Sequence, residues 1–371
     1  MRAKRWIVTA LLAATCLTGC GSSDNSSNGK TANGENANSK NASDRDPSPA
    51  NNAAPTPQTP ASGPTTYPLT VENCGKQYTY PKAPSRVVVM NGGSVAEVTS
   101  LLALGLGDRV VANTQDYGAS DEPGRAEAIA ALPNGGIKLN EMMDIPRESM
   151  LGLRPDFVIS TYGGGFDSAS GFATRADLTA IGANSYVPRA TCGGPGSIDG
   201  TQTIEDSYAL LRDLGRIFDV TDRAEKLIAE SRQKIAVTVT KVAGRPAPRV
   251  MLIIPGMTMG TSDFTSIGAN GIWNDIIHQA GGTNAFAGTT KEIFANLSKE
   301  QVAAAKVDAV IVVQYQDPNP QAAADKLFAR FPQWEASRNK RYVVLSDSAY
   351  LGPDNATAVD RTARMLHPDA F

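Results

Sequence analysis

Short apolar strands alternate with amphipathic helices along most of the chain, and this alternation restricts the fold more than any other feature. Strands are predicted at residues 86–90, 109–112, 156–160 and 184–187, with a helix ending at Leu104 after the first of them. Strands are predicted again at 249–254, 308–313 and 341–345, with helices at 269–280, 321–330 and 355–366. Such alternation indicates mostly parallel sheets flanked by helices, which is an α/β fold.

The middle of the chain interrupts this alternation. Residues 203–217 and 221–243 are helical in pattern, contain no strand, and can bend at Gly215 and at residues 220–222. We therefore predict two Rossmann-like α/β lobes joined by one long helix, with a ligand cleft between them at the strand carboxyl ends. The predicted bounds are residues 67–200 for the first lobe, 201–243 for the connecting helix and 244–371 for the second lobe.

Residues 1–19 have the pattern of a signal peptide. Cationic residues precede an apolar run at 7–17, which is too short to span a bilayer comfortably. Leu17-Thr18-Gly19-Cys20 then resembles the lipobox of bacterial lipoproteins, which implies cleavage before Cys20 and attachment of acyl chains such as palmitate. The lipid would hold the protein on the extracytoplasmic face of the cell membrane. The alternative is an ordinary secretory signal that is cleaved elsewhere.

After Cys20, the segment up to residue 66 consists almost entirely of Asn, Ser, Ala, Pro, Thr and Gly. It has no apolar periodicity, so it cannot bury enough surface to offset the entropy of ordering. Residues 20–66 are therefore predicted to be a lipidated cysteine and a disordered tether, although a featureless spacer would have the same composition.

Charge and cysteine content narrow the functional class. The formal net charge of −2 gives no electrostatic reason to expect nucleic acid as a partner. Cys74 and Cys192 are the two cysteines in the predicted folded part, and an even pair in an exported chain predicts one disulfide. Two unpaired buried thiols are the alternative.

Several segments resemble one family, and they occur in its order over roughly residues 70–366. The matching segments are Val71 to Gly75, Ala83 to Val88, Ala103 to Val111, Glu148 to Asp156, Gln279 to Asn284 and Ser298 to Val302. They resemble the helix-linked periplasmic binding proteins of ABC importers, in the group that serves ferric siderophores, haem and vitamin B12. The resemblance implies a monomeric binding protein, without catalytic activity or a resident cofactor, that delivers a small iron chelate to a permease dimer driven by a cytoplasmic ATPase.

The resemblance also implies roles for two glutamates. Residues matching Glu148 and Glu300 lie one on each lobe in this family, where they dock onto basic residues of the permease. The alternative is that both are solvated helix charges. One position departs from the pattern, because Thr99 stands near the place where the family often has a first-helix glutamate, and Glu97 is displaced from it.

The predicted strand ends supply candidate ligand-binding residues. Aromatic side chains at such positions suit a large, partly apolar ligand such as a chelate or macrocycle, although ordinary packing would also explain each of them. The candidates are Asn91, Tyr117, Tyr162, Phe166 and Arg189 from the first lobe, and Met257, Phe264, Trp273, Tyr315 and Tyr350 from the second.

Among these candidates, Arg189 is the one cation clearly placed at the predicted cleft, whereas anionic catecholate chelates call for several. Asp116 and Asp263 are expected near the same rim. The balance favours a hydroxamate-type chelate or a neutral macrocycle.

Other chemistries have weak support. The two histidines, His278 and His367, have no metal ligand at suitable spacing, which disfavours direct Zn or Mn binding. No G-x-S-x-G elbow, P-loop or dinucleotide fingerprint occurs. The leading hypothesis is a ferric siderophore binding protein. Cobalamin or haem binding is the first alternative, and a structural or signalling surface lipoprotein and a secreted hydrolase are the others.

Overall fold

The computed structural model describes residues 63–90, 94–116, 120–141, 144–193, 201–255, 257, 263–315 and 319–371. The predicted signal peptide, Cys20 and nearly all of the predicted tether lie outside these residues, as do Asn91 and Tyr117. Residues Gln58–Phe371 form one compact unit, and both sheets described below belong to it.

The first lobe contains a four-stranded parallel sheet in the order β4-β3-β5-β6. All residues of β3 and β5 are buried, as expected for central strands covered on both faces. The elements of this lobe are β3 (Val87–Val89), β4 (Val110–Asn113), β5 (Phe157–Ile159), β6 (Asn184–Tyr186), α1 (Ala96–Ala103), α2 (Arg125–Ala130), α3 (Arg147–Gly152), α4 (Arg175–Ala180), η1 (Gly107–Arg109), η2 (Gly163–Phe166), η3 (Ser168–Ser170) and η4 (Arg189–Thr191).

An antiparallel hairpin, β1 (Leu69–Asn73) and β2 (Lys76–Tyr80), packs beside this sheet. Alternate side chains of both strands are buried, and the Tyr80 ring lies 6.2 Å from that of Phe157. The two turn residues, Cys74 and Gly75, have φ values of 53° and 75°, the positive values that a two-residue hairpin turn favours. Sequence reasoning did not predict this hairpin.

The second lobe repeats the design with a parallel sheet in the order β12-β11-β7-β9. An antiparallel pair, β8 and β10, lies beside it, and β7 contacts β8. The elements are β7 (Arg249–Ile253), β8 (Phe264–Ile267), β9 (Thr283–Asn284), β10 (Phe294–Leu297), β11 (Ala309–Gln314), β12 (Tyr342–Ser346), α7 (Trp273–Gln279), α8 (Lys299–Ala304), α9 (Pro320–Arg330), α10 (Glu335–Asn339), α11 (Asn355–Leu366), η5 (Asp347–Ala349) and η6 (Pro368–Ala370).

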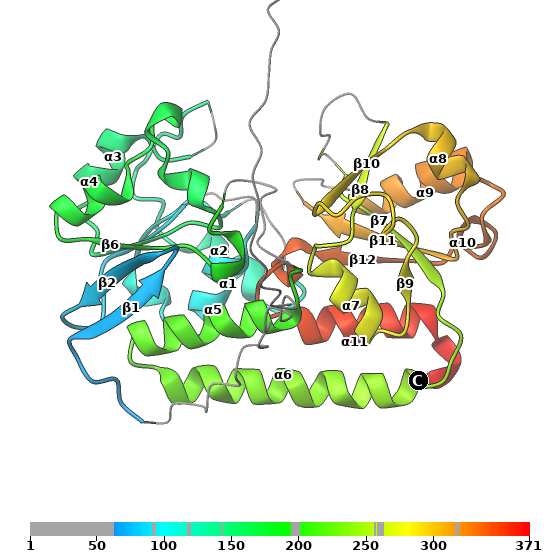
Figure 1. Cartoon of the computed structure of the whole chain (residues 1–371), viewed down its shortest axis with the longest axis horizontal. Helices are drawn as coiled ribbons and strands as arrows, with labels where there is room; N and C mark the ends of the chain where they lie inside the picture. The colour runs from blue at the N-terminus through cyan, green and yellow to red at the C-terminus, as the bar shows by residue number, and fades with distance from the viewer. Residues whose placement is uncertain are drawn as a thin grey trace, which may run out of the picture. The chain divides into compact units, whose positions relative to one another are not determined.

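Two helices, α5 (Ile204–Ile217) and α6 (Thr221–Val242), connect the lobes and pack against each other. The interval expected as one bent helix therefore contains a reversal of the chain between them. Gly215 allows their close approach, because a Cβ there would lie 2.7 Å from the Cβ of Ala224. The 22-residue α6 runs along the base in Figure 1, where it packs against α11 of the second lobe.

The predicted fold class, α/β with two lobes joined through a long helix, is confirmed. All seven predicted strands occur within one residue of their expected bounds, as β3, β4, β5, β6, β7, β11 and β12. The largest apolar cluster is continuous across the lobes, since it includes Val87, Phe157, Leu214, Ile228 and Val250. The two sheets therefore share their core through α5 and α6.

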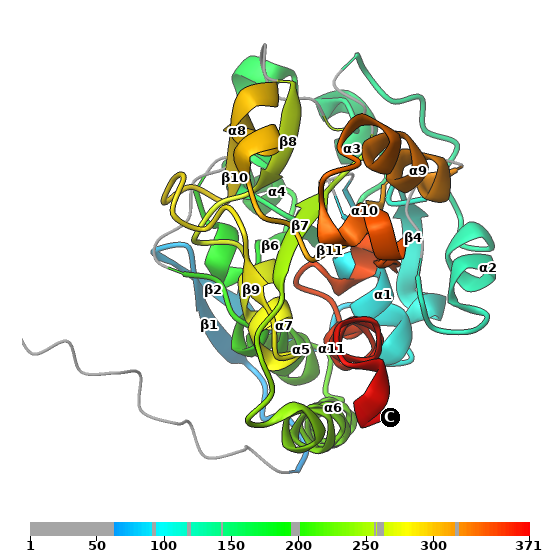
Figure 2. The same ribbon diagram turned by 90° about the vertical axis from the view of Figure 1, so that its right-hand side faces the viewer.

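The described chain starts on the turn between α5 and α6. The Thr65 amide donates to Asp219 at 2.5 Å, the Thr65 hydroxyl donates to the Arg216 carbonyl at 2.8 Å, and the Tyr67 hydroxyl donates to the Ile217 carbonyl at 2.7 Å. Helices α3 and α8 lie at the opposite side from α6 in both views (Figures 1 and 2). The chain therefore enters the body on the side away from α3 and α8.

Candidate functional site

A buried polar cluster lies at the carboxyl ends of β4 and β5. Gln115 donates its side-chain amide to Glu97 Oε2 at 2.8 Å, and the Thr161 hydroxyl donates to the same oxygen at 2.7 Å. Glu97 is fully buried, and its Oε1 has no hydrogen-bond partner among the described residues. Burial raises the pKa of Glu97, and the bonds from Thr161 and Gln115 oppose this rise. The first sheet thus ends at a carboxyl group that holds its proton to higher pH than usual.

Two tyrosines, one from each lobe, follow central strands of the two sheets. Tyr162 follows β5 and Tyr315 follows β11, and both are half-buried. Burial raises the pKa of Tyr315, and the neighbouring Asp347 and Tyr162 raise it further. Burial and Asp144 raise the pKa of Tyr162. The fold therefore brings two predicted ligand-binding residues from different lobes close enough to influence each other electrostatically.

Tyr350, from the second lobe, lies close to the Glu97 cluster. The Gln202 side-chain amide donates to the Tyr350 hydroxyl oxygen at 3.3 Å. Burial raises the pKa of Tyr350 to about 12, the bond from Gln202 lowers it, and the nearby Glu97 raises it. A carboxyl of the first lobe and a phenol of the second thus lie within electrostatic range of each other.

Hydrogen bonds join the lobes beside these residues. The Val95 amide donates to Asp347 Oδ2 at 3.3 Å, and the Ser120 hydroxyl donates to Asp354 Oδ2 at 2.8 Å. Arg361 of α11 forms an ion pair with Asp121. First-lobe segments before α1 and before α2 are therefore held against the connection between β12 and α11.

Four predicted residues have packing partners of their own. Phe166 is buried, and the Arg175 guanidinium carbon lies 5.6 Å from the centroid of the Phe166 ring. Trp273 is buried in the core at the start of α7. Phe264 lies 4.6 Å from the Arg330 guanidinium and 5.6 Å from the Phe331 ring. Met257 packs partly buried against the large core.

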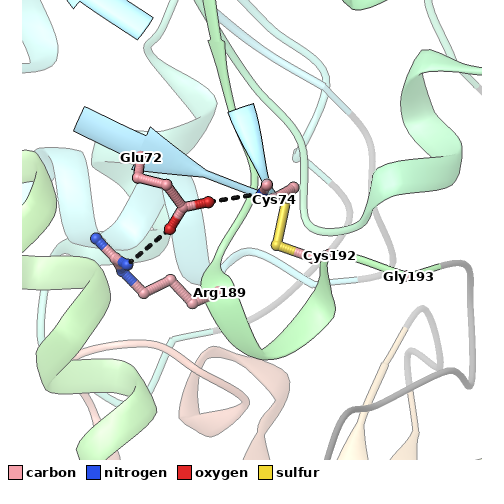
Figure 3. A pocket seen from close by; sticks show the side chains of 6 residues that line it. Glu72, Cys74, Arg189, Cys192 and Gly193 are labelled. Carbon is pink, nitrogen blue, oxygen red and sulfur yellow. Dashed lines mark hydrogen bonds and ion pairs between the residues drawn. A yellow bond between two sulfur atoms is a disulfide. The ribbon is translucent and has the colours of Figure 1, made fainter. Parts of the chain in front are cut away.

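Arg189 is held by a carboxylate of α5. Its Nε and Nη2 lie 2.8 and 3.2 Å from the two oxygens of Asp213, which hold the pKa of Arg189 above its ordinary value. The Glu72 carboxylate lies 3.8 Å away on the other side. Arg189 and Glu72 line an open cavity of about 490 Å³ beside the Cys74–Cys192 disulfide (Figure 3). The predicted disulfide is thus present, and the Arg189 guanidinium is largely engaged by protein carboxylates.

The two candidate docking glutamates both lie in the first turns of short helices. Glu148 of α3 is 85% exposed and pairs with Arg147 at 2.7 Å, and Arg147 also binds Asp177. Glu300 of α8 is exposed, next to a capping box formed by Ser298 and Gln301. Figure 1 shows α3 on the first lobe and α8 on the second, both on the side opposite α6.

Sequence reasoning did not select Gln115, Thr161 or Gln202, and it treated Glu97 only as a displaced acid. A signal was available, because Gln115 comes three residues and Thr161 one residue after a predicted strand. Their partners lie elsewhere in the sequence, since Gln115 and Thr161 bond to Glu97 of α1 and Gln202 bonds to Tyr350 of the second lobe.

Two further features of the described residues bear on function. No helix among them is long and apolar enough to cross a membrane. In the same part of the chain, no group of three or more His, Cys, Asp or Glu side chains is arranged to hold a metal ion.

Comparisons with solved structures agree with the two-lobed architecture. An ABC-type Fe3+-hydroxamate transport protein from Saccharomonospora viridis is 26% identical, with a TM-score of 0.64 over 81% of this chain and 99% of that chain. A periplasmic binding protein from Veillonella parvula is 19% identical, with a TM-score of 0.65 over 81% and 97% of the two chains. The haem-binding protein RhuT from Roseiflexus sp. is 24% identical, with a TM-score of 0.56 over 77% and 99%.

The two relatives under 25% identity bear on the fold alone. A comparison with curated proteins finds no match. The sequence model of the periplasmic binding protein family matches residues 88–349, which is more than half of the chain. This family works outside the cytoplasm, and the chain belongs to it.

Proposed function

We propose that this protein is the substrate-binding lipoprotein of an ABC importer, which captures a ferric siderophore and delivers it to a membrane permease without transforming it. The observation that carries the proposal is that Tyr162 and Tyr315, one from each lobe, follow the carboxyl ends of β5 and β11 and influence each other electrostatically. Ligands of open α/β sheets bind at such ends. The similarity to a ferric hydroxamate transport protein supports the same ligand class.

A hydroxamate-type chelate fits the charges of the described residues better than a catecholate. Arg189 is paired with Asp213 and lies close to Glu72, so its positive charge is already offset. The residues beside Tyr162 and Tyr315 include Asp144 and Asp347, which disfavour an anionic ligand. The chelate we propose is therefore neutral or weakly cationic and presents apolar surface to the tyrosine rings.

Haem or cobalamin is the alternative ligand. The similarity to the haem-binding protein from Roseiflexus supports keeping haem in the test, although it concerns the fold. A panel of a ferric trihydroxamate, a ferric catecholate, haemin and cyanocobalamin separates these ligands by quenching of intrinsic fluorescence. Submicromolar binding of the trihydroxamate alone is expected, and preferential binding of haemin or cobalamin would replace the siderophore as the cargo.

Two competing functions are tested with the same protein. A structural or signalling lipoprotein would show no rise in melting temperature with any member of the panel, whereas a specific ligand stabilises the folded state by mass action. A secreted hydrolase would turn over ester or amide substrates, which we do not expect.

We further propose that Glu148 and Glu300 dock the loaded protein onto basic residues of the permease dimer. Both are exposed, and the helices that carry them, α3 and α8, belong to different lobes and lie on the side opposite α6 (Figure 1). Replacing both with Lys should abolish uptake while leaving ligand affinity unchanged. The matched control replaces two exposed glutamates of other helices, Glu127 and Glu230, with Lys. Normal uptake by the Glu148→Lys/Glu300→Lys variant would refute docking.

Attachment through a lipid on Cys20 completes the proposal, with the protein acting as a monomer. Metabolic labelling with a radioactive fatty acid should mark the wild-type protein and leave Cys20→Ser unlabelled. The Cys20→Ser protein should appear in the medium or periplasm. Release of the wild-type protein in soluble form would instead support an ordinary secretory signal.

A further inference from the structure

The segment Thr191–Gly193, which we term the brace, holds both sides of Tyr162. The Thr191 hydroxyl donates to the carbonyl of Thr161, the residue before Tyr162. The amide of Gly163, the residue after it, donates to the Gly193 carbonyl at 3.0 Å. The residues on either side of Cys192 thus bind the residues on either side of Tyr162.

The contact between the brace and the Tyr162 loop is too close for any side chain at residue 163. A Cβ there would lie 2.4 Å from the Cys192 carbonyl oxygen and 2.9 Å from that of Gly193. Both of these neighbours are backbone atoms, which cannot rotate away as a flexible side chain would. The position of the brace therefore sets the position of the loop that begins at Tyr162.

The disulfide connects the brace to the hairpin of β1 and β2. Cys192 is bonded to Cys74, which lies in the hairpin turn. The residue before that turn, Asn73, is buried, donates its side-chain amide to the Val187 carbonyl at 2.8 Å, and accepts hydrogen bonds from the Val187 amide and from Arg175. The turn is thus fixed to the end of β6, and the disulfide transmits this fixed position to the brace.

We infer that the Cys74–Cys192 disulfide is a positioning element of the ligand site, which holds the Tyr162 loop in place through the brace. The inference rests on the proposed function for the identity of the ligand, whereas the holding of the loop is a property of the free protein. A preorganised binding side chain loses less entropy on binding, so releasing the brace should weaken binding.

The disulfide also lines the cavity of about 490 Å³ shown in Figure 3, which is open to solvent. A small dithiol can therefore reach it. In that exchange the dithiol transfers two electrons and two protons to Cys74 and Cys192 and closes into its own cyclic disulfide. Reduction thus offers a reversible test that needs no mutation.

The experiment combines hydrogen–deuterium exchange of residues 161–166 with titration of a ferric trihydroxamate, haemin and cyanocobalamin. Cys74→Ser/Cys192→Ser and dithiol-reduced wild type should show faster exchange in this loop and about tenfold weaker binding of whichever probe wild type binds. Exchange should rise less in α9 than in residues 161–166, because lost global stability acts on both segments. Reoxidation of the reduced protein should restore the affinity.

Two further variants, each with its own control, separate positioning of the loop from loss of global stability. Gly163→Ala keeps the disulfide but forces the loop away from the brace, and it should reproduce both effects. Gly288→Ala is its matched control, because a Cβ there meets nothing within 4 Å. Thr191→Val removes the bond to Thr161, and Thr191→Ser, which retains the hydroxyl, should behave as wild type.

Unchanged exchange at residues 161–166 in the disulfide-free protein overturns the inference. Faster exchange with unchanged affinity overturns it as well, because the brace would then hold a loop that does not matter for binding. If no probe binds the wild type, the proposed function fails separately, and the exchange of the free protein alone decides whether the disulfide positions Tyr162.

Discussion

The hydroxyl of Ser120, in the first lobe, donates a 2.8 Å hydrogen bond to the carboxylate of Asp354, in the second. Ser348 donates to the same carboxylate oxygen at 2.5 Å, and Asp354 is only 3% exposed. Burial is the largest influence on this group and raises its pKa to about 6, against the hydrogen bonds from Ser348 and Ser120. A titratable carboxyl thus lies in the contact between the lobes.

From this carboxyl we predict that Asp354 stabilises the folded state in mild acid. Because the folded pKa of about 6 exceeds the ordinary value of 3.8, the folded state binds the proton more tightly. The contribution of Asp354 to the free energy of unfolding is at most about 3 kcal/mol. It is fully present below about pH 4 and is lost as the pH rises through 6.

Urea unfolding at several pH values between 4 and 7.5 tests this expectation. Asp354→Asn should remove this part of the pH dependence. The quantity to compare is the difference in stability between wild type and variant at each pH. Asp177 and Asp308, whose pKa values are lowered, change the stability in the opposite direction in both proteins. Identical slopes in the two proteins would contradict the assignment.

The disulfide should contribute substantially to global stability. Cys74 and Cys192 are 118 residues apart in sequence, and closing a loop of that length restricts the unfolded chain by about 5 kcal/mol in the chain-entropy model. Denaturant unfolding of Cys74→Ser/Cys192→Ser should show a lower midpoint, matched by the reduced wild type. A midpoint equal to that of the oxidised protein would show that the unfolded chain gains little freedom from removing the bond.

Gly215→Ala should destabilise the junction of α5 and α6. The added methyl would lie 2.7 Å from the Cβ of Ala224, and overpacking of this kind typically costs about 1–3 kcal/mol. Gly152→Ala is a suitable control, since nothing lies within 4 Å of its new Cβ and alanine favours a helix. Thermal unfolding measures both, and equal stability of the two variants would argue against tight packing at the junction.

Truncation of either central tyrosine should weaken ligand binding. We expect about a tenfold rise in Kd for Tyr162→Ala and for Tyr315→Ala, with a non-additive effect in the double variant because the two phenols influence each other electrostatically. Tyr342→Ala, at the amino end of β12, is the control for losing a half-buried tyrosine. Unchanged affinity in both single variants would remove the pair from the ligand site, and strict additivity would show that the two tyrosines act independently.

The sequence predicted the fold better than the site for a physical reason. A buried strand such as β5 or β11 shows itself in consecutive apolar residues, and a helix end shows itself in its cap, so both are local signals. The β1–β2 hairpin was missed because only alternate residues are buried and its turn residues are Cys74 and Gly75, which lack the usual Asn-Gly signal.

The site depends on pairings that no local pattern encodes. Tyr162 and Tyr315 follow strands as the sequence predicts, but their electrostatic influence on each other depends on the placement of two sheets. Trp273 occupies a similar sequence context and is instead buried in the core, because apolar aromatics at helix starts serve packing equally well. The partner of Arg189, Asp213, lies on α5, so the offset of its charge could not be anticipated.

The docking of Thr65 and Tyr67 onto the turn between α5 and α6 has a consequence for how the protein would work at a membrane. If Cys20 carries a lipid, the 42 residues between it and Gly63 have a contour of about 140 Å at most. Because they join the body on the side away from α3 and α8, this length sets whether those helices can turn toward the bilayer. If α3 and α8 dock onto a permease as proposed, a shortened spacer should lower uptake without changing ligand affinity.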